Sequence, residues 1–230
     1  MAHVIITDPP RASLDEVDRL QQFGVATIHE AIGRVGLLDP RLRPIQTGVR
    51  VAGTAVTVEC WPGDNLMIHA AVEQCRPGDL LVVTTTSEST DGVFGELLAT
   101  SLHSRGVRGL ITTTGVRDTE ELRSMSFPVW SAAVSAQGTV KATAGSVNVP
   151  VAIGRTVVRP GDVVVADDDG IVLVPRRDAA VAIEAAAARM VREDQTRAAL
   201  AAGELGLDRY GLRSLLAELG VEYRKADHDE

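Results

Sequence analysis

Arg117 and Asp118 are adjacent charged residues whose side chains could act together on one ligand. They follow an apolar segment, residues 107–111, that we expect to form a strand, and open α/β sheets bind ligands at the carboxyl ends of their strands. A carboxylate there can hold a hard cation while a guanidinium grips the anion bound to that cation. A helix that begins with an aspartate beside a surface arginine explains the same residues, so the pair alone leaves both interpretations open.

Two glycines precede a predicted helix in the stretch that begins at Asp91. Gly92 lies three residues before the predicted helix over 95–104 and Gly95 is its first residue. The N–H groups of a helix start have no partner in the helix and lie at the positive end of its dipole. Such a start can cradle a carboxylate or a phosphate, although an ordinary helix start explains this spacing better when it is taken alone.

Lysine is rare in the chain, which contains only Lys141 and Lys225. A Schiff-base enzyme would have to use Lys141, because Lys225 lies close to the C-terminal end. Lys141 could equally bind a substrate carboxylate or be an ordinary surface residue.

Turn motifs separate several of the predicted strands. Residues 76–79 and 159–162 both read Arg-Pro-Gly-Asp, and each precedes an apolar strand. Because their flanking sequences differ, we interpret them as one turn used twice rather than as an internal duplication. The acidic residues 167–169, followed by Gly170, could bind a cation but fit a hairpin turn better.

The composition argues against several other classes of protein. The five histidines lack metal-ligand spacing, and Cys60 and Cys75 form neither a disulfide framework nor a zinc-type pair. Nucleophile-elbow, Walker and Rossmann patterns are missing. An excess of 31 acidic over 23 basic residues gives a formal charge of −8, which disfavours nucleic acid as a partner. No apolar run approaches the ~20 residues that span a membrane, and the start of the chain has no signal-peptide pattern, so we expect a cytoplasmic protein.

A chain of 230 residues with 45% apolar residues can bury one sizeable core, so we predict one α/β domain. Apolar periodicity predicts a helical region over 15–32 with a stop at Gly24 and a second short helix over 27–33. It also predicts helices over 65–75, 95–104 and 118–124. Apolar and β-branched segments predict strands over 49–60, 80–83, 107–112, 129–130, 149–153, 163–166 and 170–174. A helical C-terminal extension follows, with helices over 178–200 and 209–219 and a frayed tail over 226–230.

Four motifs occur in a fixed order along the chain, at residues 95–98, 115–118, 134–142 and 160–170. In this order they resemble the RraA-like superfamily. The run at 202–213 resembles in particular its 4-hydroxy-4-methyl-2-oxoglutarate / 4-carboxy-4-hydroxy-2-oxoadipate aldolase branch, since the shorter ribonuclease E regulators of the superfamily generally lack such an extension. The resemblance covers nearly the whole chain from Val17 onward.

The resemblance implies a central β-β-α swivelling-domain-like sandwich flanked by helices, in a single domain over residues 1–230. It also implies homotrimers, often paired into homohexamers, with residues 178–230 at subunit contacts and active sites between subunits. Members use Mg²⁺ or Mn²⁺ to cleave 4-carboxy-4-hydroxy-2-oxoadipate to pyruvate and oxaloacetate, or 4-hydroxy-4-methyl-2-oxoglutarate to two pyruvates. Many also decarboxylate oxaloacetate, and their setting is the degradation of aromatic compounds.

The resemblance also assigns residues to the metal and to the charge that forms during cleavage. Asp118 would be the direct metal ligand, and Arg117 would contact the keto oxygen that becomes an enolate. A further acid would reach the metal through water from a neighbouring subunit. Glu193 is the residue we assign to this role, with Asp194 as the close alternative.

The remaining assignments concern the substrate. Glu96 would hold a metal-bound water, and the backbone of Gly95, Glu96, Leu97 and Leu98 would receive the pyruvyl carboxylate. Lys141, in the third motif, would be a further substrate-binding residue.

Three other functions stay open at this point. An RraA-type regulator would bind ribonuclease E and have no aldolase activity. A Schiff-base aldolase would use Lys141 in place of a metal. A related metal-dependent lyase or decarboxylase would act on a different keto acid.

Overall fold

The computed structural model describes residues 3–226, and the chain divides into two compact units. The first ends at Ala186 and the second begins at Ala187. The frayed tail predicted over 226–230 lies, beyond Ala226, outside the described residues. Within residues 3–226, no helix combines the length and the apolar character needed to cross a membrane.

Nine strands form the main sheet of the first unit, in the order β1-β6-β5-β3-β2-β10-β11, with β4 beside β5 and β7 beside β2. The centre of the sheet is parallel and contains β2 (Val51–Cys60), β3 (Asp79–Thr85), β5 (Leu110–Val116) and β6 (Val129–Val134). Most residues of these strands are buried, because both faces of the sheet are covered. Beyond β2 the sheet continues with an antiparallel hairpin of β10 (Val163–Asp167) and β11 (Gly170–Val174).

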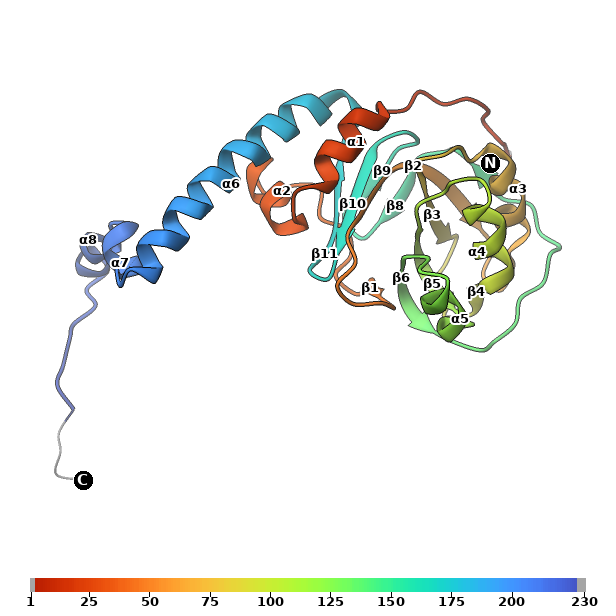
Figure 1. Cartoon of the computed structure of the whole chain (residues 1–230). Coiled ribbons are helices and arrows are strands. Elements are labelled where there is room, and N and C mark those ends of the chain that lie inside the picture. The colour runs from red at the N-terminus through yellow and green to blue at the C-terminus, as the bar shows by residue number, and fades with distance from the viewer. Residues whose placement is uncertain (1–2, 227–230) are drawn as a thin grey trace. The chain divides into compact units, whose positions relative to one another are not determined.

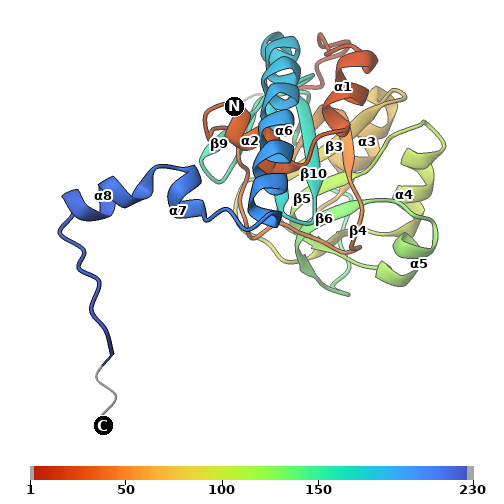
Figure 2. The ribbon, with the colours of Figure 1, turned by 60° about the vertical axis from the view of Figure 1, so that its left-hand side comes forward.

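Three helices cover one face of this sheet. They are α3 (Leu66–Gln74), α4 (Glu96–His103) and α5 (Thr119–Ser124), and α4 contacts both of the others, as Figure 1 and Figure 2 show. Their buried side chains, among them Leu102 and Leu122, share one apolar cluster with the strands. Since each helix directly follows a strand, all three begin at the carboxyl edge of the sheet.

The opposite face has its own apolar cluster, which includes the fully buried ring of Trp130. The two-stranded sheet of β8 (Val151–Ile153) and β9 (Thr156–Val158) contributes to this cluster. Helices α1 (Leu14–Gln21) and α2 (Val25–Ala31) pack against β2 and β11 respectively. The prediction of a mixed α/β sandwich with flanking helices is therefore confirmed.

Both Arg-Pro-Gly-Asp segments form the same turn. Gly78 and Gly161 have φ angles of 90° and 81°, which favour glycine. In each turn the aspartate carboxylate accepts the N–H of the arginine three residues earlier, at 2.7 Å for Asp79 and 3.3 Å for Asp162. The acidic residues 167–169 likewise form the predicted hairpin turn, in which Asp167 pairs with Gly170.

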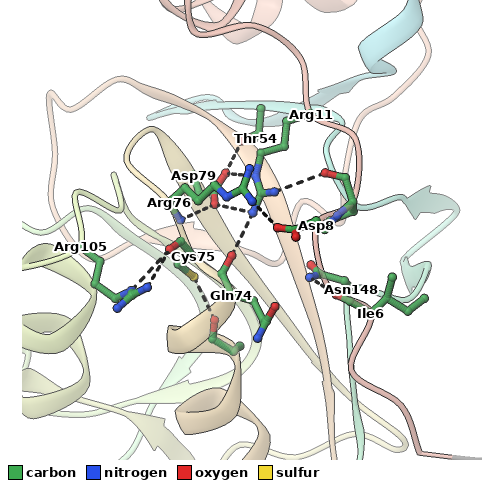
Figure 3. A network of polar contacts seen from close by, with 12 residues as sticks. Ile6, Asp8, Arg11, Thr54, Gln74, Cys75, Arg76, Asp79, Arg105 and Asn148 are labelled. Carbon is green, nitrogen blue, oxygen red and sulfur yellow. Dashed lines mark hydrogen bonds and ion pairs between the residues drawn. The ribbon is translucent and has the colours of Figure 1, made fainter.

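An extended N-terminal segment is fastened to the sheet by a buried ion pair (Figure 3). The Arg11 guanidinium donates to both carboxylate oxygens of Asp79, at 2.9 and 3.0 Å, and Asp79 is fully buried. The Thr54 hydroxyl and the Arg76 N–H donate to the same carboxylate. Four donors therefore compensate for the burial of this charge.

Three short strands join the sheet at its margins: β1 (Arg43–Pro44), β4 (Gly92–Phe94) and β7 (Ser146–Val147). Strand β4 was not predicted, because a three-residue segment that begins with a glycine carries no apolar periodicity. The prediction also ended β5 too early, at Thr112, whereas the strand continues to Val116. Both differences bear on the site, since β4 and the end of β5 pair in parallel.

The C-terminal region is helical, as predicted. After a short 3-10 turn (Arg176–Asp178), α6 (Ala179–Ala201) begins in the first unit and continues into the second. The last predicted helix, 209–219, corresponds to α8 (Leu212–Glu218) but was placed three residues too early at its start, and the short α7 (Gly206–Arg209) before it was not predicted. The two helices are separated at Gly211, whose φ of 64° interrupts a right-handed helix.

Candidate active site

Asp118 lies between the end of β5 and the start of α5, in a strained conformation. Its backbone is left-handed, with φ 54° and ψ 43°, a region that residues other than glycine seldom occupy. Such strain costs about 1–3 kcal/mol and is concentrated at functional sites. The side chain does not cap α5 and contacts the start of α4 instead.

Gly95 provides the surface on which the Asp118 carboxylate rests. Oδ2 of Asp118 accepts the N–H of Glu96 at 3.1 Å, so the carboxylate lies at the positive end of the α4 dipole. A Cβ atom on Gly95 would come within 2.2 Å of the same oxygen. The glycine is therefore required here by close approach, since its φ of −158° is open to any residue.

Arg117 lies beside this carboxylate. Its N–H donates to the carbonyl of Phe94 at 2.9 Å, which joins the end of β5 to the end of β4. Its Nε lies 3.7 Å from Oδ2 of Asp118, and both side chains are about two-fifths exposed. The pair thus combines a fixed cation and a fixed carboxylate that solvent can reach.

Glu96 occupies the first turn of α4. One oxygen of its carboxylate accepts the Thr100 hydroxyl at 2.7 Å, which orients the side chain along the helix. Glu96 also lines a cavity of about 530 Å³ between α4 and α5. The next residue, Leu97, is 80% exposed, whereas Leu98 is buried in the core. Of these two leucines, therefore, only Leu97 could contact a ligand through its side chain.

Two further glycines allow the strands to meet closely at this edge. A Cβ on Gly92 would come within 2.3 Å of the Ser135 carbonyl, and one on Gly115 within 2.1 Å of the Thr90 carbonyl. From the sequence, Gly92 was assigned to the backbone of a helix start, and Gly115 was named only as the first residue of the second motif. Their structural role is to let β4, β5 and the segment after β6 pack together.

A Thr112–Thr114 hydroxyl pair lies in β5, a few residues before Arg117 and Asp118, and was not predicted. The two oxygens lie 2.6 Å apart in the fully buried interior, and the Thr112 hydroxyl also accepts the N–H of Thr114 at 3.2 Å. The pairing of β5 with β6 shifts register at this point, between Thr112 and Gly115. Such bulges redirect a strand next to functional sites.

Lys141 is exposed and lies in the segment that follows β6. The same segment passes the site, because the Gln137 carbonyl accepts the N–H of Gly92 at 2.9 Å. Further along this segment, the N–H groups of Ala142 and Thr143 donate to the carboxylate of Asp64, which is 2% exposed. Asp64 was missed, although residues 62–64 repeat the Pro-Gly-Asp of the two turns described above.

Glu193 and Asp194 lie in the second unit, on α6. There Glu193 forms an ion pair with Arg189 at 2.7 Å, and Asp194 pairs with Arg197. The structure therefore brings together Gly95, Glu96, Arg117 and Asp118, whereas the predicted role of Glu193 or Asp194 remains a prediction.

The oxygen donors of the site suit an Mg²⁺ or Mn²⁺ ion that takes few protein ligands and completes its shell with water and substrate. Asp118 offers a carboxylate that solvent can reach and that the backbone at the start of α4 holds in place, and hard cations prefer such oxygen ligands. No group of three or more His, Cys, Asp or Glu side chains within residues 3–226 is placed to hold a metal ion. Mg²⁺ usually binds one or two carboxylates and completes its shell with water and substrate, so the residues present fit this mode of binding.

The fold and this site define the class of protein. Residues 25–173 match the sequence model of the RraA-like family, described as Aldolase/RraA. This match spans more than half of the chain, and the chain belongs to the RraA-like family.

Curated relatives connect the chain with the aldolase branch. A protein of Halalkalibacterium halodurans is 26% identical over 166 residues, which are 72% of this chain and 79% of the relative. A protein of Burkholderia multivorans is 34% identical over 143 residues, or 62% and 87% of the two chains. Both bear the name “Putative 4-hydroxy-4-methyl-2-oxoglutarate aldolase”.

Solved structures share the fold. Streptomyces coelicolor RraAS2, described as an unusual member of the RNase ES inhibitor RraA protein family, aligns with a TM-score of 0.73 and 28% identity. The alignment covers 83% of this chain and 99% of RraAS2. The family thus includes proteins named for two different functions.

Proposed function

We propose that the protein is a divalent-metal-dependent aldolase that cleaves a 4-hydroxy-2-oxo acid and releases pyruvate. The observation that carries this proposal is the placement of Asp118 on Gly95, beside Arg117 and at the start of α4. Four residues from two separate motifs meet there at the carboxyl edge of a parallel sheet, where α/β proteins bind their ligands.

Arg117 stabilises the charge that cleavage creates. When the C4 hydroxyl loses its proton, the C3–C4 bond breaks and its electron pair passes to the pyruvyl fragment as an enolate. C4 becomes the carbonyl of the second keto acid, and a proton added at C3 completes pyruvate. The guanidinium is permanently charged and directional, so it can donate to the enolate oxygen throughout.

Asp118 is the residue that would hold the metal, with Glu96 beside it. Mg²⁺ or Mn²⁺, when bound, supplies Lewis-acid polarisation of the substrate oxygens. The strained backbone of Asp118 and the N–H of Glu96 fix the carboxylate before any ligand arrives. The Thr100 hydroxyl donates to one carboxylate oxygen of Glu96. We propose that the second oxygen accepts a hydrogen bond from a water near the C4 hydroxyl of the substrate.

The substrate carboxylate would lie at the start of α4. The N–H groups of Leu97 and Leu98 belong to the first turn, where the helix offers them no carbonyl. They therefore favour an anion at this position. Lys141 would add a positive charge to the same carboxylate.

The preferred substrate in this proposal is 4-carboxy-4-hydroxy-2-oxoadipate, with 4-hydroxy-4-methyl-2-oxoglutarate as the second. Decarboxylation of oxaloacetate is an expected side activity, because loss of CO₂ leaves the same pyruvate enolate. The relatives named as aldolases support this class of substrate. We also propose a cytoplasmic homotrimer or homohexamer, in which Glu193 of a neighbouring subunit completes the site.

A coupled assay tests the proposal. Pyruvate released from 4-carboxy-4-hydroxy-2-oxoadipate is measured through lactate dehydrogenase, first with Mg²⁺ and then with EDTA. The expected result is turnover that disappears with EDTA and returns with excess Mg²⁺. Borohydride with pyruvate should leave Lys141 unlabelled, whereas a Schiff-base aldolase would be trapped on it.

The similarity to RraAS2 supports a second candidate function, inhibition of a ribonuclease of the E type. An RraA-type regulator would bind the ribonuclease without aldolase activity. Pull-down with the ribonuclease, run beside the aldolase assay on the same preparation, separates the two functions. Binding without turnover would favour the regulator.

A further inference from the structure

Asp64 is a buried carboxylate that collects three backbone N–H groups. Oδ1 accepts the N–H of Leu66 at 2.8 Å, and Oδ2 accepts those of Ala142 and Thr143 at 2.8 and 2.7 Å. One carboxylate therefore joins the start of α3 to a segment almost eighty residues further along the chain. The donors on Oδ2 follow Lys141 directly.

Gly63 and Asn65, the two neighbours of Asp64, form hydrogen bonds with Val140, the residue before Lys141. The carbonyl of Gly63 accepts the N–H of Val140 at 2.9 Å, and the N–H of Asn65 donates to the Val140 carbonyl at 3.0 Å. Lys141 is thus bracketed by hydrogen bonds at the residue before it and at the two residues after it. All of them come from the turn at residues 63–65, which we call the Asp64 clamp.

The Asp64 clamp is also tied to the candidate site. The Asn65 side-chain amide donates to the carbonyl of Val93 at 2.9 Å in the buried interior, and Val93 lies in β4, which leads into Gly95. At its other end the segment reaches the site directly, since a Cβ on Gly138 would lie 3.7 Å from a guanidinium nitrogen of Arg117.

The negative charge of Asp64 suits a side chain that accepts three backbone N–H groups. Burial alone would favour the neutral acid, but the three N–H donors outweigh it and hold the pKa of Asp64 below its usual value. An ionised carboxylate accepts several strong hydrogen bonds at once, which a neutral amide cannot do because half of its polar group is a donor.

We propose that Asp64 is a positioning residue that fixes Lys141 beside the carboxylate-binding start of α4. This inference rests on the proposed function, in which Lys141 binds the substrate carboxylate. Asp64 itself touches no substrate. It acts by holding the backbone on both sides of Lys141, so the Cα from which the lysine side chain extends stays in one place.

The test is the substitution Asp64→Asn, which keeps the shape of the side chain. One amide oxygen can still accept the Leu66 N–H, while the amide nitrogen faces the N–H groups of Ala142 and Thr143 as a second donor. We expect KM for 4-carboxy-4-hydroxy-2-oxoadipate to rise about tenfold, as for loss of a hydrogen bond to a charged group, with kcat changed less than about twofold. Amide exchange at Ala142 and Thr143 should become faster.

A matched control comes from Asp162, which is also buried and accepts two backbone N–H groups, those of Arg159 and Arg176. Asp162→Asn should lower stability without the change in KM. A double-mutant cycle with Lys141→Ala then separates positioning from general damage. In the Lys141→Ala background, Asp64→Asn should raise KM no further.

His69 gives a readout that needs no turnover. Burial first, and the charge of Lys141 second, lower the pKa of His69. Displacement of Lys141 in Asp64→Asn should raise the His69 pKa, measured by NMR, in the direction that Lys141→Ala also produces.

Two results would overturn the proposal: an unchanged KM in Asp64→Asn despite faster exchange at Ala142 and Thr143, or a KM effect that adds fully to that of Lys141→Ala. Absence of any turnover in the unaltered protein would instead reject the proposed function. In that case the exchange and His69 measurements still decide whether Asp64 positions Lys141.

Discussion

Arg117 carries a permanent positive charge, 3.7 Å from the Asp118 carboxylate, on a side chain that remains accessible. Its proposed task needs direction as well as charge, because an enolate oxygen must receive a hydrogen bond along a defined line. Arg117→Lys therefore should keep the fold and lose turnover by about a hundred- to a thousandfold, the usual effect of removing one preorganised donor. Steady-state kcat, with thermal unfolding as the control, measures this, and near-normal turnover would remove Arg117 from the mechanism.

Asp118 is assigned to the metal. Asp118→Asn retains an oxygen that can accept the N–H of Glu96, so the start of α4 should stay intact while the anionic ligand is lost. We expect the apparent Mg²⁺ affinity to fall at least about tenfold, since even partners behind the ligands change affinity by that much. A Mg²⁺ titration of activity, repeated calorimetrically, gives the value. An unchanged titration curve would reject the ligand role.

Gly95 has no side chain, which leaves room for the carboxylate of Asp118. In Gly95→Ala the added carbon would lie 2.2 Å from Oδ2 of Asp118, so the carboxylate must leave its cradle. Activity and Mg²⁺ affinity should fall together, while the unfolding midpoint changes little. Gly138→Ala is the matched control, because its added carbon would meet Arg117 only at 3.7 Å, an ordinary contact. Equal effects of the two substitutions would argue against the cradle.

At the scale of elements, the N-terminal segment is held by Arg11 and the fully buried Asp79 (Figure 3). Arg11→Ala should lower the free energy of unfolding by about 3 kcal/mol, because it leaves a buried carboxylate without its cation. Urea unfolding measures the change. Asp8→Asn removes the exposed pair of Asp8 with Arg76 and should cost less than about 1 kcal/mol. If the two substitutions lowered the free energy of unfolding by similar amounts, burial would not be what makes the Arg11–Asp79 pair the stronger one.

The main strands and helices could be predicted because each is a long apolar run with its own period and stop signals. Strand β4 could not, since three residues carry no periodicity and its pairing with β5 is a tertiary contact. The end of β5 was missed for a similar reason, because Gly115 interrupts the apolar pattern and the strand continues to Val116 only through its pairing with β4 and β6. Gly211 divides α7 from α8 through a backbone angle that the apolar pattern does not contain.

The site could be predicted in part from its motifs. Glu96 and Asp118 are 22 residues apart, and the parallel pairing of β4 and β5 brings their atoms within 3.1 Å. Asp64 was not predicted, because its partners Ala142 and Thr143 are distant in sequence and donate through their backbones, which leave no trace in residue type. The Thr112–Thr114 pair was missed because a bulge depends on strand register.

At the scale of the whole molecule, the proposal includes a second chain, because Glu193 of a neighbouring subunit would reach through water the metal held by Asp118. If Glu193 completes the site of a neighbouring subunit, Asp118→Asn and Glu193→Gln should each be inactive alone. Oligomers mixed from the two variants should regain activity at about a quarter of their sites, because each such site takes its intact Asp118 and its intact Glu193 from different chains. Recovery with Asp194→Asn instead would transfer the role to Asp194, and no recovery would place the site within one subunit.

The central claim is metal-dependent cleavage of a 4-hydroxy-2-oxo acid. The most direct test is pyruvate release from 4-carboxy-4-hydroxy-2-oxoadipate with Mg²⁺, then with EDTA, corrected for pyruvate that arises from decarboxylation of oxaloacetate. We predict turnover that EDTA abolishes and Mg²⁺ restores. Turnover that persists undiminished in EDTA, or no cleavage by a folded oligomer at any Mg²⁺ concentration, would contradict the account.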